Sequence, residues 1–139
     1  MMIFDQPRGV RNNNPGNIDK TSIAWQGMSD YQDDPRFVVF TSAVYGIRAL
    51  AKILLNYQNI DGLVTMREII DRWAPPVEND VSAYVDDVSQ KTGLYPDHAV
   101  DLSNVSTLTV VVNAIIAHEC DNYVYPPSVI EQGISLSEN

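Results

Sequence analysis

The chain has 139 residues, of which 45% are hydrophobic, and its formal net charge at pH 7 is −9. This length and composition predict a single folded domain, residues 1–139, with a hydrophobic core, and they exclude a disordered chain. The excess of acidic side chains argues against a nucleic-acid partner, because duplex-binding surfaces are normally basic. The single cysteine, Cys120, excludes an internal disulfide.

The sequence contains no segment that is typical of export or membrane insertion. The opening stretch, MMIFDQPRGV, lacks the cationic and apolar regions of a signal peptide. The longest apolar stretch, VVV and AII on either side of Asn113, is too short to cross a membrane. We therefore expect synthesis in the cytoplasm without a signal peptide and no membrane insertion.

Polar turn signals dominate residues 1–35. The segment NNNPGN suggests a type II turn in which Gly16 supplies the positive φ of the second central residue. A short β segment is expected at residues 36–40. Asp30, Asp33 and Asp34 resemble part of a calcium loop but lack its glycine and distal glutamate, which favours a solvated loop.

The remainder of the chain predicts five helices around this small β and loop region. Thr65 and Glu68 have capping-box spacing, and Asp80 and Gly93 can begin and end another helix. The expected fold class is therefore mostly α, in an α+β arrangement. The predicted helices cover residues 41–58, 65–73, 80–93, 106–119 and 126–134.

The helix predicted over residues 106–119 places a carboxylate on its apolar face. At about 100° per residue, Glu119 falls in the middle of an apolar stripe. Partial burial and the negative end of the helix dipole would both raise its pKa, which suits a general acid. The alternative is a frayed helix end with a solvated Glu119. The stripe consists of Leu108, Val111, Val112, Ile115 and Ile116.

Other reactive side chains give weaker signals. His98, His118 and Cys120 lack the spacing of a metal motif, so we expect neither a metal nor another cofactor. A nucleophilic pair of Cys120 and His98 stays open, although no feature of the sequence orients it. Glu78 follows two prolines and can project into a cleft, or it can be a first-turn helix acid.

Four segments together resemble a family of small phage-type, lysozyme-like peptidoglycan hydrolases, which includes endolysins and virion-associated lysins. They are RGVRNNNPGNI, WQG, FVVFTSAVYGIRAL and RWAPPVEND, and the resemblance spans residues 8–134. It implies a lysozyme-like domain encoded by a bacteriophage, with bacterial peptidoglycan as its partner. Such a protein is made in the host cytoplasm and acts on the cell wall after release or from a virion.

A more distant similarity implies a circular permutation. In flagellar-type and autolysin glucosaminidases, a helix that ends in the catalytic glutamate precedes an asparagine-rich turn and a Trp-x-Gly motif. Here the turn and WQG come first and the helix ending AIIAHE comes last, so Glu119 matches the catalytic glutamate. Related sequences tend to continue with Asn-Gly, whereas this chain has Cys120 and Asp121.

The resemblance implies cleavage of peptidoglycan glycan strands by a muramidase, lytic transglycosylase or glucosaminidase, with Glu119 as general acid and Glu78 as a secondary candidate. The asparagines can bind acetamido sugars or form a network within the turn, and the aromatic side chains can stack on sugars or pack below the loop. The candidate substrate-binding residues are Asn13, Asn14, Asn17, Trp25 and Tyr125.

A non-catalytic virion structural or cell-wall-binding protein is the alternative function. The net charge of −9 favours it, because an acidic protein is repelled by anionic envelopes.

Overall fold

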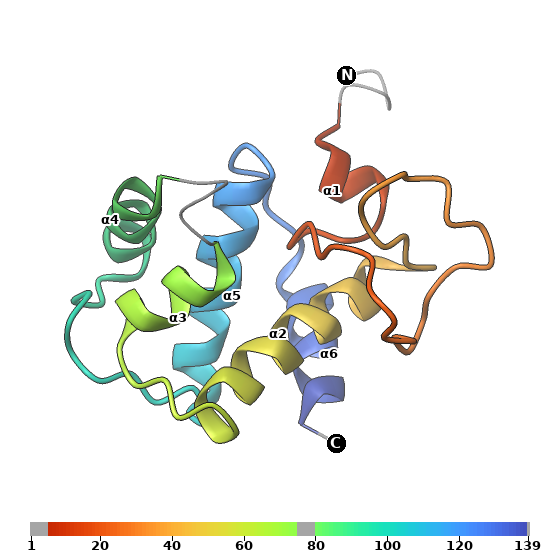
Figure 1. The fold of residues 1–139 in the computed structure, drawn as a ribbon. Helices are drawn as coiled ribbons and strands as arrows, with labels where there is room; N and C mark the ends of the chain where they lie inside the picture. Colours follow the sequence, from red (N-terminus) through yellow and green to blue (C-terminus); the bar gives the residue numbers. More distant parts are fainter. Residues whose placement is uncertain (1–5, 75–79, 139) are drawn as a thin grey trace.

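The structure is a computed structural model that describes residues 6–74 and 80–138, and it is mostly helical (Figure 1). The fold class expected from the sequence is confirmed at this level. No helix in these two ranges is long and apolar enough to span a membrane. The helices are α1 (Arg8–Arg11), α2 (Ala43–Asn59), α3 (Met66–Trp73), α4 (Val81–Thr92), α5 (Val105–Glu119) and α6 (Pro127–Ser137).

All five predicted helices are present, and their caps explain where they begin and end. The Thr65 side chain accepts a hydrogen bond from the Glu68 backbone, and the Glu68 side chain accepts one from the Thr65 backbone, which completes the capping box of α3. Asp80 accepts from the Ala83 backbone at 3.1 Å. Gly93 ends α4 with a φ of +75°.

Helix α2 crosses the molecule between two groups of elements (Figure 1). On one side lie α3, α4 and α5; on the other lie α1 and the long loop that leads to α2. The main hydrophobic core joins α2 to the surrounding helices, and a smaller cluster lies under the loop. Trp73, at the end of α3, packs against both clusters. The smaller cluster consists of Ile18, Val38, Phe40 and Ala49.

The expected β segment at 36–40 does not form a strand. Only isolated bridges occur there, between Asp19 and Phe37 and between Met28 and Phe40. The buried Asn14 amide accounts for the difference: it donates to the Ile18 carbonyl at 3.0 Å and to the Val38 carbonyl at 2.9 Å. The Val38 N–H still donates to the Ile18 carbonyl at 3.0 Å, but the Ile18 N–H donates to Asn14 Oδ1, so the amide takes the place of one backbone bond of a regular ladder.

The predicted type II turn is also wrong in its conformation. The Asn17 backbone does donate to the Asn14 carbonyl, at 2.9 Å, so a turn is present. However, the left-handed residues are Asn13, with a φ of 54°, and Asn17, with a φ of 52°, whereas Gly16 is not left-handed. Asparagine tolerates this region better than other side chains. Gly16 is instead suited to close packing, because an added Cβ would lie 3.1 Å from Trp73 Cζ2.

Asp34 is buried, which corrects the expectation of a solvated loop. It accepts two hydrogen bonds from the Arg8 guanidinium, both at 2.6 Å, and one from Asn12 at 2.9 Å. The backbones of Arg36 and Phe37 donate to it as well, each at 2.8 Å. One carboxylate therefore ties α1 to the loop that follows the asparagine-rich turn.

We expect Asp34→Asn to lower the free energy of unfolding by about 2 kcal/mol at pH 7, since buried donors lose their charged acceptor. The Arg8 guanidinium holds the pKa of Asp34 well below its usual range, and the Asn12, Arg36 and Phe37 donors add to this effect against burial. This stabilisation is complete above the unfolded-state pKa of about 4 and is lost as the pH falls towards the folded-state pKa.

The difference in the free energy of unfolding between wild type and Asp34→Asn, measured by urea unfolding, should therefore shrink below about pH 4. The exposed neighbour Asp33, changed to Asn, is the matched control and should leave stability almost unchanged. An Asp34→Asn protein as stable as the control at pH 7 would contradict this role.

Candidate active site

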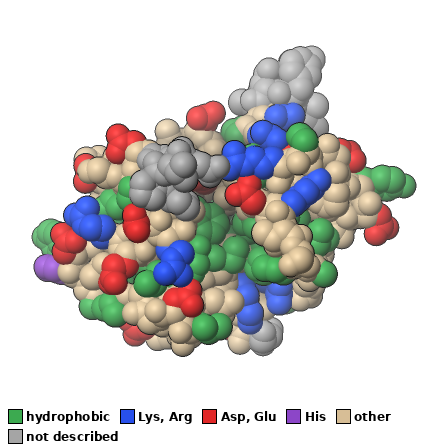
Figure 2. Space-filling model, viewed as in Figure 1, with side chains coloured by type: hydrophobic (Ala, Val, Ile, Leu, Met, Phe, Trp, Pro, Cys, Tyr) green, Lys and Arg blue, Asp and Glu red, His purple; other side chains and the backbone are tan. Residues whose placement is uncertain are grey.

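A cavity of about 610 Å³ lies where the N-terminal loop meets the ends of α3 and α5. Apolar side chains gather across the middle of this face of the molecule, with acidic and basic side chains around them (Figure 2). The volume falls in the range of small-molecule sites in proteins. The cavity is lined by Gly16, Asn17, Ile18, Asp19, Thr21, Ile23, Trp25, Arg36, Phe37, Ile53, Asn56, Tyr57, Asp61, Arg72, Trp73, Ala74 and Glu119.

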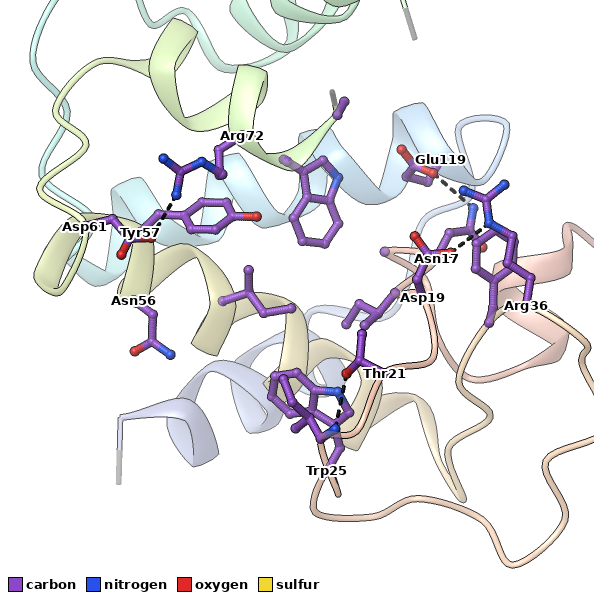
Figure 3. Close-up of a pocket in the computed structure, with 17 residues that line it drawn as sticks. Asn17, Asp19, Thr21, Trp25, Arg36, Asn56, Tyr57, Asp61, Arg72 and Glu119 are labelled. Atoms are coloured by element: carbon purple, nitrogen blue, oxygen red, sulfur yellow. Dashed lines mark hydrogen bonds and ion pairs between the residues drawn. The ribbon is translucent and has the colours of Figure 1, made fainter. Parts of the chain in front are cut away.

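Glu119 is the last residue of α5 and its carboxylate lies at one end of this cavity (Figure 3). Ile115 and Ile116, on the same helix, are almost completely buried, as the periodicity predicts. The carboxylate accepts a hydrogen bond from Asn17 Nδ2 at 3.0 Å and from the Tyr84 hydroxyl at 2.8 Å. Glu119 is therefore half-buried and hydrogen-bonded, rather than solvated at a frayed helix end.

The asparagine-rich turn brings Asn17 to Glu119. Asn14, which is fully buried, accepts from the Ile18 backbone at 3.0 Å in addition to its two donated bonds, and Asn13 Nδ2 donates to the Phe40 carbonyl at 3.1 Å. The side-chain amides of both residues therefore bond to the backbone of the loop. The prediction that Asn14 contacts the substrate is wrong, because this side chain is fully buried. Asn17 alone among the three predicted asparagines lines the cavity.

The turn is packed tightly against the end of α5. A Cβ added at Gly9 would lie 2.9 Å from both Asn17 Oδ1 and Cys120 Sγ. The Cys120 thiol donates to the Pro15 carbonyl at 3.3 Å. Burial, together with the nearby charges of Glu119 and Asp121, raises the pKa of this thiol to about 12. Cys120 is therefore a protonated packing residue, which argues against the nucleophilic alternative.

Helix α5 ends without a glycine at its C-terminus. Asp121 and Asn122 adopt left-handed backbone conformations instead, with φ values of 51° and 63°. Both residue types tolerate this region. The chain can therefore turn away directly after Cys120, which keeps Glu119 at the end of the helix.

Tyr84 reaches Glu119 from α4. Its ring is 1% exposed and stacks on His118 with 3.6 Å between ring centroids. Burial raises the pKa of its hydroxyl strongly, and the charge of Glu119 and the hydrogen bond to Glu119 add to this effect. The hydroxyl therefore keeps its proton and remains a hydrogen-bond donor to Glu119.

A second carboxylate, Asp19, lines the same cavity and was not predicted from the sequence. It pairs with Arg36 at 2.7 Å, and Figure 3 shows both side chains on the Glu119 side of the cavity. The antiparallel bridge between Asp19 and Phe37 brings this pair together. The predicted secondary candidate, Glu78, lies outside the described residues.

Polar and aromatic side chains from α2 and α3 lie across the cavity from Glu119 (Figure 3). Arg72 pairs with Asp61 at 3.0 Å, and its guanidinium carbon lies 5.8 Å from the centre of the Tyr57 ring. Asn56 belongs to the same group. These side chains offer hydrogen-bond donors and acceptors to a ligand that extends along the cavity.

The two predicted aromatic ligands occupy different environments. Trp25 lines the cavity and also packs against the smaller hydrophobic cluster. Tyr125 is only 7% exposed, makes an edge contact with Tyr123 at 4.9 Å between centroids, and does not line the cavity. In the ranges 6–74 and 80–138, no three His, Cys, Asp or Glu side chains are grouped to hold a metal ion.

Comparison with known proteins shows that the chain is similar to a bacteriophage protein. No protein-family model matches the sequence. The chain is 38% identical over 134 residues to protein P5 of Pseudoalteromonas phage PM2, an alignment that covers 94% of this chain and 82% of the phage protein. This chain therefore belongs to the family of the PM2 protein P5.

Proposed function

We propose that the protein cleaves the glycan strands of bacterial peptidoglycan, with Glu119 as the general acid, in a circularly permuted lysozyme-like domain. The observation that carries the proposal is the contact between Asn17 and Glu119 at the cavity, across 102 positions of sequence. In the families that the chain resembles, the catalytic helix and the asparagine-rich turn are neighbours in sequence. Here the order is reversed, yet the two motifs meet in space.

The surroundings of Glu119 suit proton transfer to a leaving sugar. Cleavage of a glycosidic bond requires a proton on the bridging oxygen while positive charge develops on the sugar ring. The two groups that hydrogen-bond Glu119, an amide and a phenol, are neutral. Their two hydrogen bonds, one to each carboxylate oxygen, set the orientation of the carboxyl group.

Asp19 is the second carboxylate that a hydrolytic mechanism needs. Its position with Glu119 at the cavity supports a role in activating water or in stabilising the developing charge, in addition to its ion pair with Arg36. Glu78 remains the other candidate. If neither is required, the muramic 6-hydroxyl group or the substrate acetamide supplies the nucleophile, and the products then include an anhydro sugar in the first case.

The relationship to a phage protein supports an action on the bacterial cell wall, either after release from the host or from a virion. The second candidate function, a virion structural or wall-binding protein without turnover, is favoured by the net charge of −9. Both functions would use the same cavity, so the test that separates them is whether the protein cleaves peptidoglycan or only binds it.

We expect the purified protein to clear peptidoglycan embedded in a gel, and Glu119→Gln to abolish clearing, because the amide cannot deliver a proton. Glu131, an exposed residue of α6, changed to Gln is the matched control and should clear as well as wild type. Mass spectrometry of the products identifies the bond and shows whether a reducing or an anhydro end is formed. Binding to sacculi without clearing by the wild type would favour the structural function.

Two substitutions at Asn17 separate its side chain from its backbone conformation. Asn17→Gly and Asn17→Ala both remove the bond to Glu119, so both should lower activity at least tenfold. At a φ of 52°, alanine is strained and glycine is not. The free energy of unfolding of Asn17→Ala should therefore be lower by about 1 kcal/mol than that of Asn17→Gly. Equal urea stability of the two variants, or activity equal to wild type, would contradict this assignment.

Salt should accelerate the attack on whole sacculi. The acidic protein and an anionic wall repel each other, and this repulsion is screened when the Debye length falls from about 30 Å at 0.01 M salt to about 8 Å at 0.15 M. We expect faster clearing over this interval and no comparable change with a short neutral chitooligosaccharide as substrate. Slower clearing at higher salt would indicate that local attraction dominates.

A further inference from the structure

We infer that Tyr84 is a positioning residue for Glu119, whose carboxylate it holds through the phenolic hydroxyl. This inference rests on the proposed function. It adds a residue that does not itself line the cavity and acts through Glu119, which does.

The Tyr84 ring has little freedom to move. It is 1% exposed within the main core between α4 and α5, and it stacks on His118 at an interplanar angle of 28°. His118 Nδ1 lies 2.7 Å from a carboxylate oxygen of Asp87, and Asp87 also pairs with Lys91. The ring is therefore fixed from α4 and from α5, so that its hydroxyl meets Glu119 Oε2 at 2.8 Å in a defined direction.

The direction of the hydroxyl proton follows from its partner. An ionised carboxylate can only accept, so in the 2.8 Å bond the Tyr84 hydroxyl donates to Glu119.

A second hydrogen bond fixes the carboxyl group of Glu119 from the side of the asparagine-rich turn. Asn17 holds the other carboxylate oxygen from the opposite element, so the plane of the carboxyl group is set from two sides.

Tyr84→Phe tests the inference because it removes one oxygen and keeps the stacked ring. On soluble peptidoglycan fragments we expect kcat to fall about 10- to 100-fold, with KM changed less than about twofold, since only the orientation of the acid is lost. The melting temperature should stay within a few degrees of wild type. The control is Tyr95→Phe, which removes a hydroxyl from an exposed ring outside the cavity and should leave kcat unchanged.

Wild-type kcat for Tyr84→Phe would overturn the inference, as would a large drop in melting temperature with parallel changes in kcat and KM. An inactive wild type would instead refute the proposed function, so the two failures are distinguishable.

Discussion

The cavity depends on a buried amide that satisfies three backbone groups. Asn14 bonds to both backbone groups of Ile18 and to the Val38 carbonyl, and it is completely shielded from solvent. Loss of this amide removes three hydrogen bonds at once, although the Ile18 carbonyl keeps its bond from the Val38 N–H. The turn is consequently rigid, and its rigidity delivers Asn17 to Glu119 and the Gly16 backbone to Trp73.

The site is built from pieces of chain that share no local structure. The loop contributes Asn17 and Asp19, helix α5 contributes Glu119, and α3 contributes Trp73. The direct partners of the Glu119 carboxylate in the described residues are two neutral donors. The cavity also contains two charged pairs, Asp19 with Arg36 on the Glu119 side and Asp61 with Arg72 across from it.

Local patterns were sufficient to predict the helices but insufficient for the loop. Periodicity and capping residues such as Thr65 and Asp80 act within one turn of chain, so the helix positions followed from the sequence. The conformation of 12–40 depends on long-range side-chain bonds, from Asn14 to the Val38 carbonyl and from Arg8 to Asp34, which no local rule specifies. The carboxylate at Glu119 was found from its place on an apolar stripe. Asp19 and Tyr84 were missed because their roles arise only from tertiary contacts.

The long sequence separation of Asn17 and Glu119 affects when the complete cavity can exist during protein synthesis. Asn17 leaves the ribosome early, whereas Glu119 is 102 positions further along the chain. At about 5–20 residues per second, translation of that interval takes on the order of 5–20 s. Contacts between such distant residues also form late in folding, because the intervening chain must first be closed into a loop. A nascent or truncated chain that lacks Glu119 therefore has an incomplete cavity lining. The cavity is complete only after nearly all of the domain has been synthesised.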